Sequence, residues 1–181
     1  MAFRFLLSAF CFLLPASCFL LSCNNPAPTG IIHNSSTKTE ETNPLVLGNK
    51  KIVELENEEI ELFLKRYKWR MIKTDTGLRY KITKKGVGKN IEKGETVTLE
   101  YCIGLLNGEK LYNSTDNGLK RFAVEKSEEI AGLHEAVQLM NKGCEALLII
   151  PSHLAYGATG DGYLVVPYQT LVVEIKLVIS D

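Results

Sequence analysis

The sequence lacks the residue patterns that metal-dependent, nucleotide-dependent and nucleophilic enzymes require. Its histidines, His33, His134 and His153, show no metal-ligand spacing to cysteines or carboxylates. We therefore expect no metal site, and we expect surface or helix-capping roles for the three histidines. Gly86-Val87-Gly88 lacks the residues that surround a phosphate-binding glycine loop. The sequence thus offers no recognisable catalytic cluster, and this absence is neutral evidence about chemistry that needs neither a cofactor nor a nucleophile.

An excess of charge of either sign is also absent. The chain has 21 basic and 21 acidic residues among 181, and no basic stripe is present. Nucleic-acid binding depends on phosphate neutralisation, so this balance argues against a nucleic-acid partner. Hydrophobic residues make up 45% of the chain, which is enough for a core. The length indicates one domain with tails.

The five cysteines do not form the framework of a disulfide-rich domain. Three of them, Cys11, Cys18 and Cys23, lie near the N-terminus. The other two are Cys102, in a strand pattern, and Cys144, beside a turn glycine. Export would permit oxidation of this pair. We expect instead that both are small buried hydrophobic side chains.

Residues 1–22 have the layout of a secretory signal, because Arg4 is followed by an uncharged apolar run from Phe5 to Leu21. The run is marginal as a membrane span. Leu20-Leu21-Ser22-Cys23 resembles a bacterial lipoprotein signal, which implies acylation of Cys23, for example by palmitate. The alternative is an ordinary signal peptide in which Cys23 is incidental. Cys18 is a second, weaker candidate for acylation. The resemblance implies a lipid anchor in the cell envelope, on a membrane surface facing the periplasm.

Two segments separate this signal from the main domain. Residues 23–50 are rich in Asn, Pro, Ser, Thr and Glu, which predicts a flexible tether. Residues 51–73 have helical periodicity. The apolar stripe of that helix consists of Ile60, Phe63, Leu64, Tyr67 and Met71. We favour packing of this stripe against the main domain over a dimerisation or partner helix.

From Thr74 onward the hydrophobic period changes to two, which predicts strands. The alternating positions are Leu78, Tyr80 and Ile82, and then Val97, Leu99, Tyr101, Ile103 and Leu105. Asn107-Gly108 predicts a hairpin turn with positive φ at both residues. Residues 110–113 and 121–124 read as one returning strand that a loop divides.

The remaining residues predict a short helix between strands. The helix would carry Ile130, Leu133, Val137 and Met140 on one face and end by Gly143. Residues 146–150 form an apolar strand, and alternation from Leu171 to Ile179 predicts the last one. Between them, residues 152–169 form a loop long enough to suggest a functional role. The prediction is an α+β fold: about five antiparallel strands wrapped around a short helix, with an extra N-terminal helix.

Residues 75–181 resemble an FKBP-type peptidyl-prolyl isomerase domain over their whole length. The strongest segment is the run of eight residues from Ile150 to Gly157, IPSHLAYG, followed by Val166-Pro167. Weaker segments in the same order are TGLRY at 76–80, GETV at 94–97, NGEKL at 107–111 and IAGLHEA at 130–136. Together with the lipoprotein signal and the short helix, they resemble the gliding-motility-associated FKBP-type isomerase lipoproteins. The subgroup implies a role in maturing envelope motility or secretion components.

The resemblance implies a site for prolyl segments of unfolded or exported proteins. The residues implied as catalytic are Tyr101, Tyr156, Leu111 and Tyr112, and those implied as substrate-binding are Phe122, Glu129, Ile130, Leu133, Val165 and Val173. Glu129 and Ile130 would offer backbone groups, and the Tyr156 hydroxyl would donate to a peptide carbonyl. For Tyr101, Phe122 and Val173, plain core packing is an equal alternative.

Three positions depart from the family pattern. The family usually has an aromatic residue where Leu111 stands, Asp where Tyr112 stands, and often Trp where Leu133 stands. The resemblance thus implies a prolyl isomerase whose activity these changes reduce. We rank an enzyme first, a binding module or chaperone on the same fold second, and a structural part of an envelope machine third.

Overall fold

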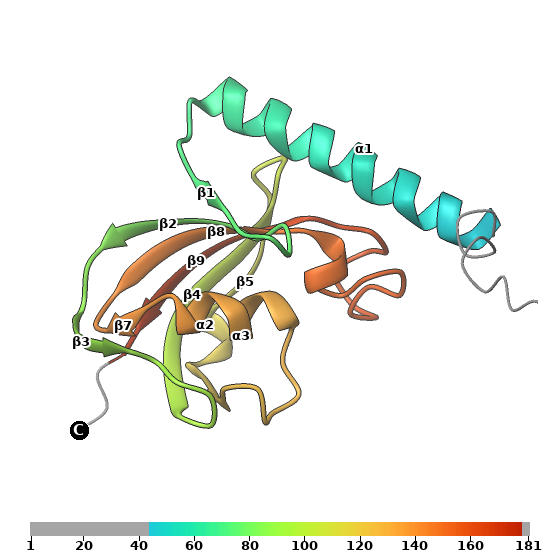
Figure 1. Ribbon diagram of the computed structural model, residues 1–181. Helices are drawn as coiled ribbons and strands as arrows, with labels where there is room; N and C mark the ends of the chain where they lie inside the picture. The colour runs from blue at the N-terminus through green and yellow to red at the C-terminus, as the bar shows by residue number, and fades with distance from the viewer. Residues whose placement is uncertain (1–43, 179–181) are drawn as a thin grey trace, which may run out of the picture. The chain divides into compact units, whose positions relative to one another are not determined.

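The computed structural model describes residues 44–178, and an antiparallel sheet forms their main body (Figure 1). Its strands are β1 Ile72–Lys73, β2 Arg79–Lys84, β4 Thr96–Leu105, β5 Lys110–Asn113, β6 Lys120–Ala123, β8 Glu145–Ile150 and β9 Leu171–Leu177. Their order is β1-β2-β8-β9-β4-β5, and β6 also pairs with β4. Two further strands, β3 Val87–Asn90 and β7 Asn141–Lys142, form a separate pair. The predicted α+β class is confirmed.

The core lies between this sheet and α3, the helix Ala131–Gln138. The four predicted core-facing residues of this segment, Ile130, Leu133, Val137 and Met140, are at most 8% exposed. Inward-facing strand residues such as Leu99, Leu148 and Val173 complete the core, and none of them is more than 1% exposed. The period-two and helical patterns therefore identified the buried faces correctly.

The predicted returning strand is present as two halves beside β4. β6 pairs with the first half of β4, from Thr96 to Leu99, and β5 pairs with the second half, where Cys102 faces Asn113. A single helical turn, α2 Ser114–Asn117, divides them. The Asp116 N–H donates to the Asn113 side-chain oxygen at 2.9 Å and caps that turn.

The hairpin before β5 differs from the prediction in its backbone. Gly108 has φ of 91°, but Asn107 is not in the positive-φ region. The Gly108 N–H donates to the Leu105 carbonyl at 3.0 Å, and the Leu105 N–H donates to the Glu109 carbonyl at 2.9 Å. This is a three-residue loop with one left-handed residue, so the expectation of positive φ at both residues was wrong.

The N-terminal helix has other bounds than the predicted 51–73. Helix α1 runs over Pro44–Tyr67, so residues 44–50 of the predicted tether are helical. It ends because Lys68 adopts φ of 55° while the N–H of Trp69 bonds to the Leu64 carbonyl at 3.0 Å. Residues 72–73 pair with β2 instead of continuing the helix. The signal, Cys23 and most of the predicted tether lie outside the described residues.

Helix α1 packs on the outer face of the sheet, opposite α3. Ile60 of α1 is fully buried, and so is Ile149 of β8, which points away from the core cluster. Beside Ile149 in the sheet lies Arg79, which donates to the Asn57 side-chain oxygen at 2.8 Å and to Glu61 at 3.0 Å. The helix therefore packs on the domain as expected, through Ile60, but Tyr67 of the predicted stripe is 52% exposed and Met71 lies beyond the end of the helix.

Two remaining sequence expectations concern cysteines and membrane spans. Cys144 is buried as predicted, but Cys102 is only half-buried because it points outward from β4, so that expectation was wrong for Cys102. Both are free thiols in the structure. Within residues 44–178, no helix is long and apolar enough to cross a membrane.

Candidate functional site

A groove of about 500 Å³ opens where three segments meet. These segments are the start of β6, the N-terminal end of α3 and the long loop after β8, which begins with the short helix η1 Ser152–Leu154. The residues that line the groove are Lys120, Glu128, Glu129, Ile130, Ala131, Ala155 and Tyr156. The groove therefore brings together three of the predicted site residues, Glu129, Ile130 and Tyr156.

Tyr156 supplies the hydrogen-bond donor of the groove. Its ring is half-buried, and no partner for its hydroxyl is found among residues 44–178. Burial, followed by the negative charges of Glu129 and Asp161 and the nearby Tyr101, raises the pKa of the Tyr156 hydroxyl above its ordinary value of 10.0. This group therefore stays protonated at neutral pH and is free to donate to a ligand.

Glu129 lies on the other side of the groove, and each oxygen of its carboxylate accepts one hydrogen bond. One oxygen accepts from the Ile130 N–H at 3.0 Å and the other accepts from Lys120 at 2.7 Å. Lys120 Nζ in turn lies 5.6 Å from the ring centroid of Tyr101. The backbone donor that the resemblance assigns to the ligand is thus already bonded. A peptide carbonyl has to displace the Glu129 carboxylate to reach the Ile130 N–H.

Tyr112 and Asp161 connect β5 to the long loop. The Tyr112 hydroxyl donates to one Asp161 oxygen, while the backbone N–H groups of Tyr163 and Val165 donate to the other at 2.9 and 2.8 Å. Burial and this bond raise the pKa of Tyr112 to about 12. Burial alone would raise the pKa of the Asp161 carboxyl, but the hydrogen bonds from Tyr112 and the loop backbone outweigh it and hold that pKa below 3.8. Tyr112 therefore anchors the loop.

The other predicted site residues do not line the groove. Phe122, Leu133, Val165 and Val173 are at most 5% exposed and belong to the closed core. Leu111, Tyr112 and Tyr101 are partly buried and pack against that core. The core-packing alternative therefore describes Phe122 and Val173, whereas Tyr101 lies between the core and Lys120. Binding by these seven residues stays a prediction.

Sequence reasoning missed four lining residues, Lys120, Glu128, Ala131 and Ala155. Glu128 and Ala131 flank the predicted pair Glu129-Ile130, and Ala155 precedes Tyr156, so proximity to the motif was a usable signal. Lys120 had no such signal, because its place depends on β6 pairing with β4. Two predicted surface histidines also have defined contacts. His134 accepts from the Glu125 N–H at 3.0 Å, and His153 bonds to the Thr76 carbonyl at 2.9 Å.

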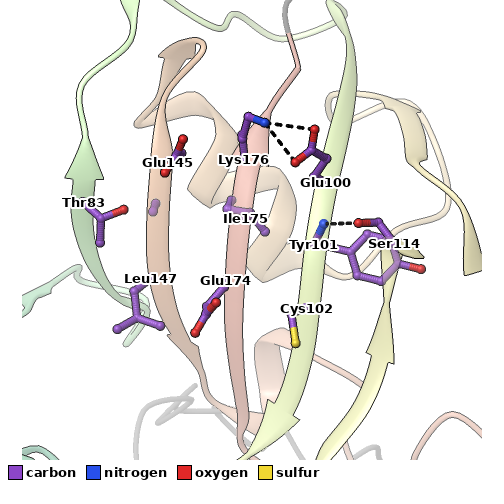
Figure 2. Close-up of a pocket in the computed structure, with 11 residues that line it drawn as sticks. Thr83, Glu100, Tyr101, Cys102, Ser114, Glu145, Leu147, Glu174, Ile175 and Lys176 are labelled. Atoms are coloured by element: carbon purple, nitrogen blue, oxygen red, sulfur yellow. Dashed lines mark hydrogen bonds and ion pairs between the residues drawn. The ribbon is translucent and has the colours of Figure 1, made fainter. Parts of the chain in front are cut away.

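A second hollow, of about 400 Å³, lies on the outer face of the sheet across β2, β8, β9 and β4. Figure 2 shows that its charged side chains come from neighbouring strands, with Lys176 bonded to both oxygens of Glu100 at 3.0 Å. Ser114 accepts there from the Tyr101 N–H at 3.2 Å. Lys176 and Glu100 of this hollow pair with each other, Glu145 pairs with Lys84 outside it, and Tyr156 is not among its lining residues. We therefore take the groove at Tyr156 as the candidate site.

The fold is a small α+β domain with a groove at the N-terminal end of α3, and comparisons with known proteins identify its family. Residues 88–178 match the family model described as FKBP-type peptidyl-prolyl cis-trans isomerase. The FK506-binding protein of Neisseria meningitidis is 33% identical over 102 residues, which are 56% of this chain and 94% of that protein. The chain belongs to the FKBP-type peptidyl-prolyl cis-trans isomerase family.

Longer relatives are similar to the chain over stretches of about the same length. The Neisseria meningitidis protein named probable FKBP-type peptidyl-prolyl cis-trans isomerase FkpA is 44% identical over 105 residues, 58% of this chain and 38% of its own length. The outer membrane protein MIP of Legionella longbeachae is 37% identical over 57% of this chain and 44% of its own. The chain thus spans about two fifths of the length of these relatives.

Solved structures confirm the predicted FKBP-like fold. The crystal structure of FkpA from Escherichia coli superposes with a TM-score of 0.61 at 28% identity, covering 72% of this chain and 61% of that one. AtFKBP13 superposes with a TM-score of 0.58 at 25% identity, covering 62% of this chain and 99% of that one.

Proposed function

We propose that this protein is a peptidyl-prolyl cis-trans isomerase that assists the folding of exported or envelope proteins. The observation that carries the proposal is the Tyr156 hydroxyl, which has no hydrogen-bond partner within residues 44–178 and lies in a groove beside the N-terminus of α3 in a member of the FKBP-type family. The reaction needs no cofactor, because no bond is made or broken when a prolyl amide rotates.

The physical problem is the barrier to amide rotation, which is about 18–20 kcal/mol because twisting destroys amide resonance. Uncatalysed exchange takes roughly tens to hundreds of seconds. Turnover in milliseconds requires a barrier lower by about 5–7 kcal/mol. A twisted amide has less charge separation than a planar one, so an apolar environment disfavours it less. Binding the twisted state more tightly than the planar state lowers the barrier.

The groove supplies the elements of this mechanism. Ile130, Ala131 and Ala155 present apolar surface to a prolyl ring, and the Tyr156 hydroxyl donates to a neighbouring peptide carbonyl. Lys120 and Glu129 form the charged rim and neutralise each other at 2.7 Å. When Glu129 moves aside, the Ile130 N–H becomes a second donor that fixes the peptide.

A protease-coupled isomerisation assay on the full chain in detergent, with several residues before proline, tests this function. Tyr156→Phe removes only the hydroxyl, and we expect kcat/KM to fall about two- to tenfold, the value of one hydrogen bond. The matched control is Tyr163→Phe in the same loop, where the side chain is 83% exposed. Equal rates for the wild type and the peptide alone, from folded protein, contradict the enzyme.

A binding module or chaperone is the second candidate, and the bond between Glu129 and the Ile130 N–H favours it. This bond withholds one of the two donors from the substrate. Leu111, Tyr112 and Leu133, which depart from the family pattern, add to this argument. Saturable binding of a prolyl peptide without faster isomerisation would support the module against the enzyme.

We further propose a lipid anchor at Cys23 that holds the domain at the membrane surface facing the periplasm. The support is the LLSC sequence at 20–23 and the envelope location in the name of the MIP relative. Metabolic labelling with palmitate tests it. Cys23→Ser abolishes the label, whereas Cys18→Ser, the matched control, keeps it. The opposite pattern would move the anchor to Cys18.

The clients, by resemblance to the gliding-motility-associated lipoproteins, are proteins of the envelope motility or secretion apparatus. Comparison of envelope proteins between wild-type and deletion cells tests this role. We expect the clients to fall in the deletion strain and to recover with the wild type but not with Tyr156→Phe at equal expression. Unchanged motility and unchanged envelope proteins in the deletion strain would contradict it.

A further inference from the structure

Helix α1, which precedes the part of the chain matched by the family model, places one carboxylate inside the domain. Glu56 is 8% exposed and accepts three hydrogen bonds. The donors are the Ser152 N–H at 2.6 Å, the Ser152 hydroxyl at 2.9 Å and the Thr170 hydroxyl at 2.5 Å. A buried carboxylate is tolerated when such bonds replace its hydration.

The two residues that Glu56 holds are the two ends of the long loop. Ser152 follows the end of β8 by two residues, and Thr170 directly precedes β9. Tyr156 lies between these ends. Glu56 therefore joins both ends of the loop that carries the Tyr156 hydroxyl. It lies 96 residues before Ser152 and 114 residues before Thr170 in the sequence.

A short series of hydrogen bonds leads from Glu56 to Tyr156. The Ser152 carbonyl accepts from the Ala155 N–H at 3.0 Å and from the Gly157 N–H at 2.8 Å, the two neighbours of Tyr156. The Gly157 carbonyl then accepts from the Tyr168 N–H at 2.8 Å, which ties the returning part of the loop to it. Glu56 thus holds Ser152 through its N–H and hydroxyl, and the carbonyl of the same residue fixes the backbone on both sides of Tyr156.

The docking of α1 does not depend on Glu56 alone. One residue further along the helix, Asn57 accepts from Arg79 at 2.8 Å, and Glu61 accepts from the same guanidinium at 3.0 Å. Ile60, between them, is fully buried. These contacts hold the helix on β2 without touching the loop, so they allow the two roles of α1 to be separated by substitution.

We propose that Glu56 is a positioning residue of the prolyl site, and that α1 is therefore a functional part of the isomerase domain. This inference rests on the proposed function of the groove. Glu56 acts through Ser152 on Tyr156 and does not contact the substrate. It sets how well the Tyr156 hydroxyl meets the carbonyl of the twisted amide.

The test compares Glu56→Gln with the matched control Asn57→Ala in the full chain. Glu56→Gln keeps the size of the side chain but replaces an acceptor oxygen by an NH₂ group that faces the loop donors. We expect kcat to fall about three- to tenfold with KM nearly unchanged, because small displacements of a positioned group reduce rates strongly. Asn57→Ala weakens α1 docking, lowers stability and leaves kcat within about twofold of the wild type.

A double-mutant cycle with Tyr156→Phe then separates positioning from general destabilisation. If Glu56 acts through the Tyr156 hydroxyl, the change in log kcat that Glu56→Gln causes in the Tyr156→Phe protein is less than half of the change that it causes in the wild type. Equal effects in both backgrounds, or an equal loss of kcat in Asn57→Ala, overturn the proposal. If Glu56→Gln does not fold, Ser152→Ala removes one donor, and the same reduced effect in the Tyr156→Phe background is expected.

Hydrogen exchange of the ligand-free protein keeps this test independent of the isomerase activity. Glu56→Gln accelerates exchange of the Gly157 and Tyr168 amides at least tenfold, whereas Asn57→Ala does not. If the wild type has no isomerase activity but this pattern is found, the proposed function fails while the control of the loop by Glu56 stands. Unchanged exchange in Glu56→Gln overturns the positioning role whatever the activity.

Discussion

Removing the Tyr112 hydroxyl tests how the long loop that carries Tyr156 is anchored to β5. Tyr112→Phe deletes the bond to Asp161 and leaves the ring, whose packing against the core is retained. A hydrogen bond to a charged group contributes about 1.5–3 kcal/mol when it is well buried. Both side chains are partly exposed, and Asp161 keeps its two backbone donors, so water replaces much of the loss. We expect a decrease of about 1 kcal/mol in the free energy of unfolding at pH 8.

The pH dependence of this effect has a definite sign. The pKa of Tyr112 is raised from 10.0 to about 12 in the folded protein, so folding favours the protonated hydroxyl. Its contribution is therefore complete below pH 10 and is lost as the pH rises from 10 to about 12. The stability difference between the wild type and Tyr112→Phe should shrink over this interval.

Urea unfolding at several pH values, followed by circular dichroism, measures this difference. An absorbance titration of phenolate formation checks that the phenol with a pKa of about 12 disappears in Tyr112→Phe. Tyr163→Phe, which removes an exposed hydroxyl from the same loop, is the control and should match the wild type. A Tyr112→Phe variant as stable as the wild type at pH 8, or a difference that does not vary above pH 10, would refute the reasoning.

Three further predictions concern the groove and its loop. Glu129→Ala frees the Ile130 N–H for the peptide, so KM in the isomerisation assay should fall about two- to tenfold, and a rise in KM would show that Glu129 helps binding. Gly132→Ala would place a Cβ 2.4 Å from the Ile150 side chain and 3.2 Å from the Leu154 carbonyl. The cost of this overpacking, about 1–3 kcal/mol, exceeds the gain of about 1 kcal/mol in helix propensity. Thermal unfolding should therefore show net destabilisation, and the isomerisation assay should show a slower enzyme. The pKa of Asp161 lies below 3.8 in the folded protein, so its ionised carboxylate stabilises the fold above that pH, and this stabilisation is lost as the pH falls through the folded-state pKa. The free energy of unfolding of Asp161→Asn should therefore vary less between about pH 5 and 3 than that of the wild type. An unchanged slope would contradict the assignment.

The sequence predicted the parts of the fold that depend on local periodicity. Alternation identified the strands that carry Leu99 and Val173, and helical spacing identified Leu133 and Val137 as core residues. The two halves of the returning strand were also recognisable, because each half has its own polar boundary. In all these cases a single element shows which of its faces is buried.

The sequence did not predict the polar groups whose roles depend on distant partners. Arg79 occupies an outward position of β2, where alternation indicates solvent exposure, but α1 covers it and leaves it 1% exposed. Glu56 looks like one of many surface charges on a helix, and its partners are 96 and 114 residues away. Tyr112 and Asp161, 49 residues apart, meet only because the loop folds over β5. No periodicity within one element contains such information.

Three of the site residues that the resemblance implies lie together at the groove, and their role in binding stays a prediction. Tyr156, Ile130 and Glu129 line the groove, but Phe122 and Val173 are closed core residues that do not reach it. The side chain of Glu129 bonds to the Ile130 N–H, which a family pattern based on backbone donors does not predict.

Exchange spectroscopy by NMR on a short prolyl peptide tests most directly whether the groove beside Tyr156 catalyses prolyl rotation, because it needs no coupling enzyme. With substoichiometric wild-type protein, we predict exchange between the cis and trans resonances in less than about one second, and a much slower exchange with Tyr156→Ala. The uncatalysed process takes roughly tens to hundreds of seconds. If exchange remains on that time scale while the folded wild type binds the peptide, the domain is a binding module and not an isomerase.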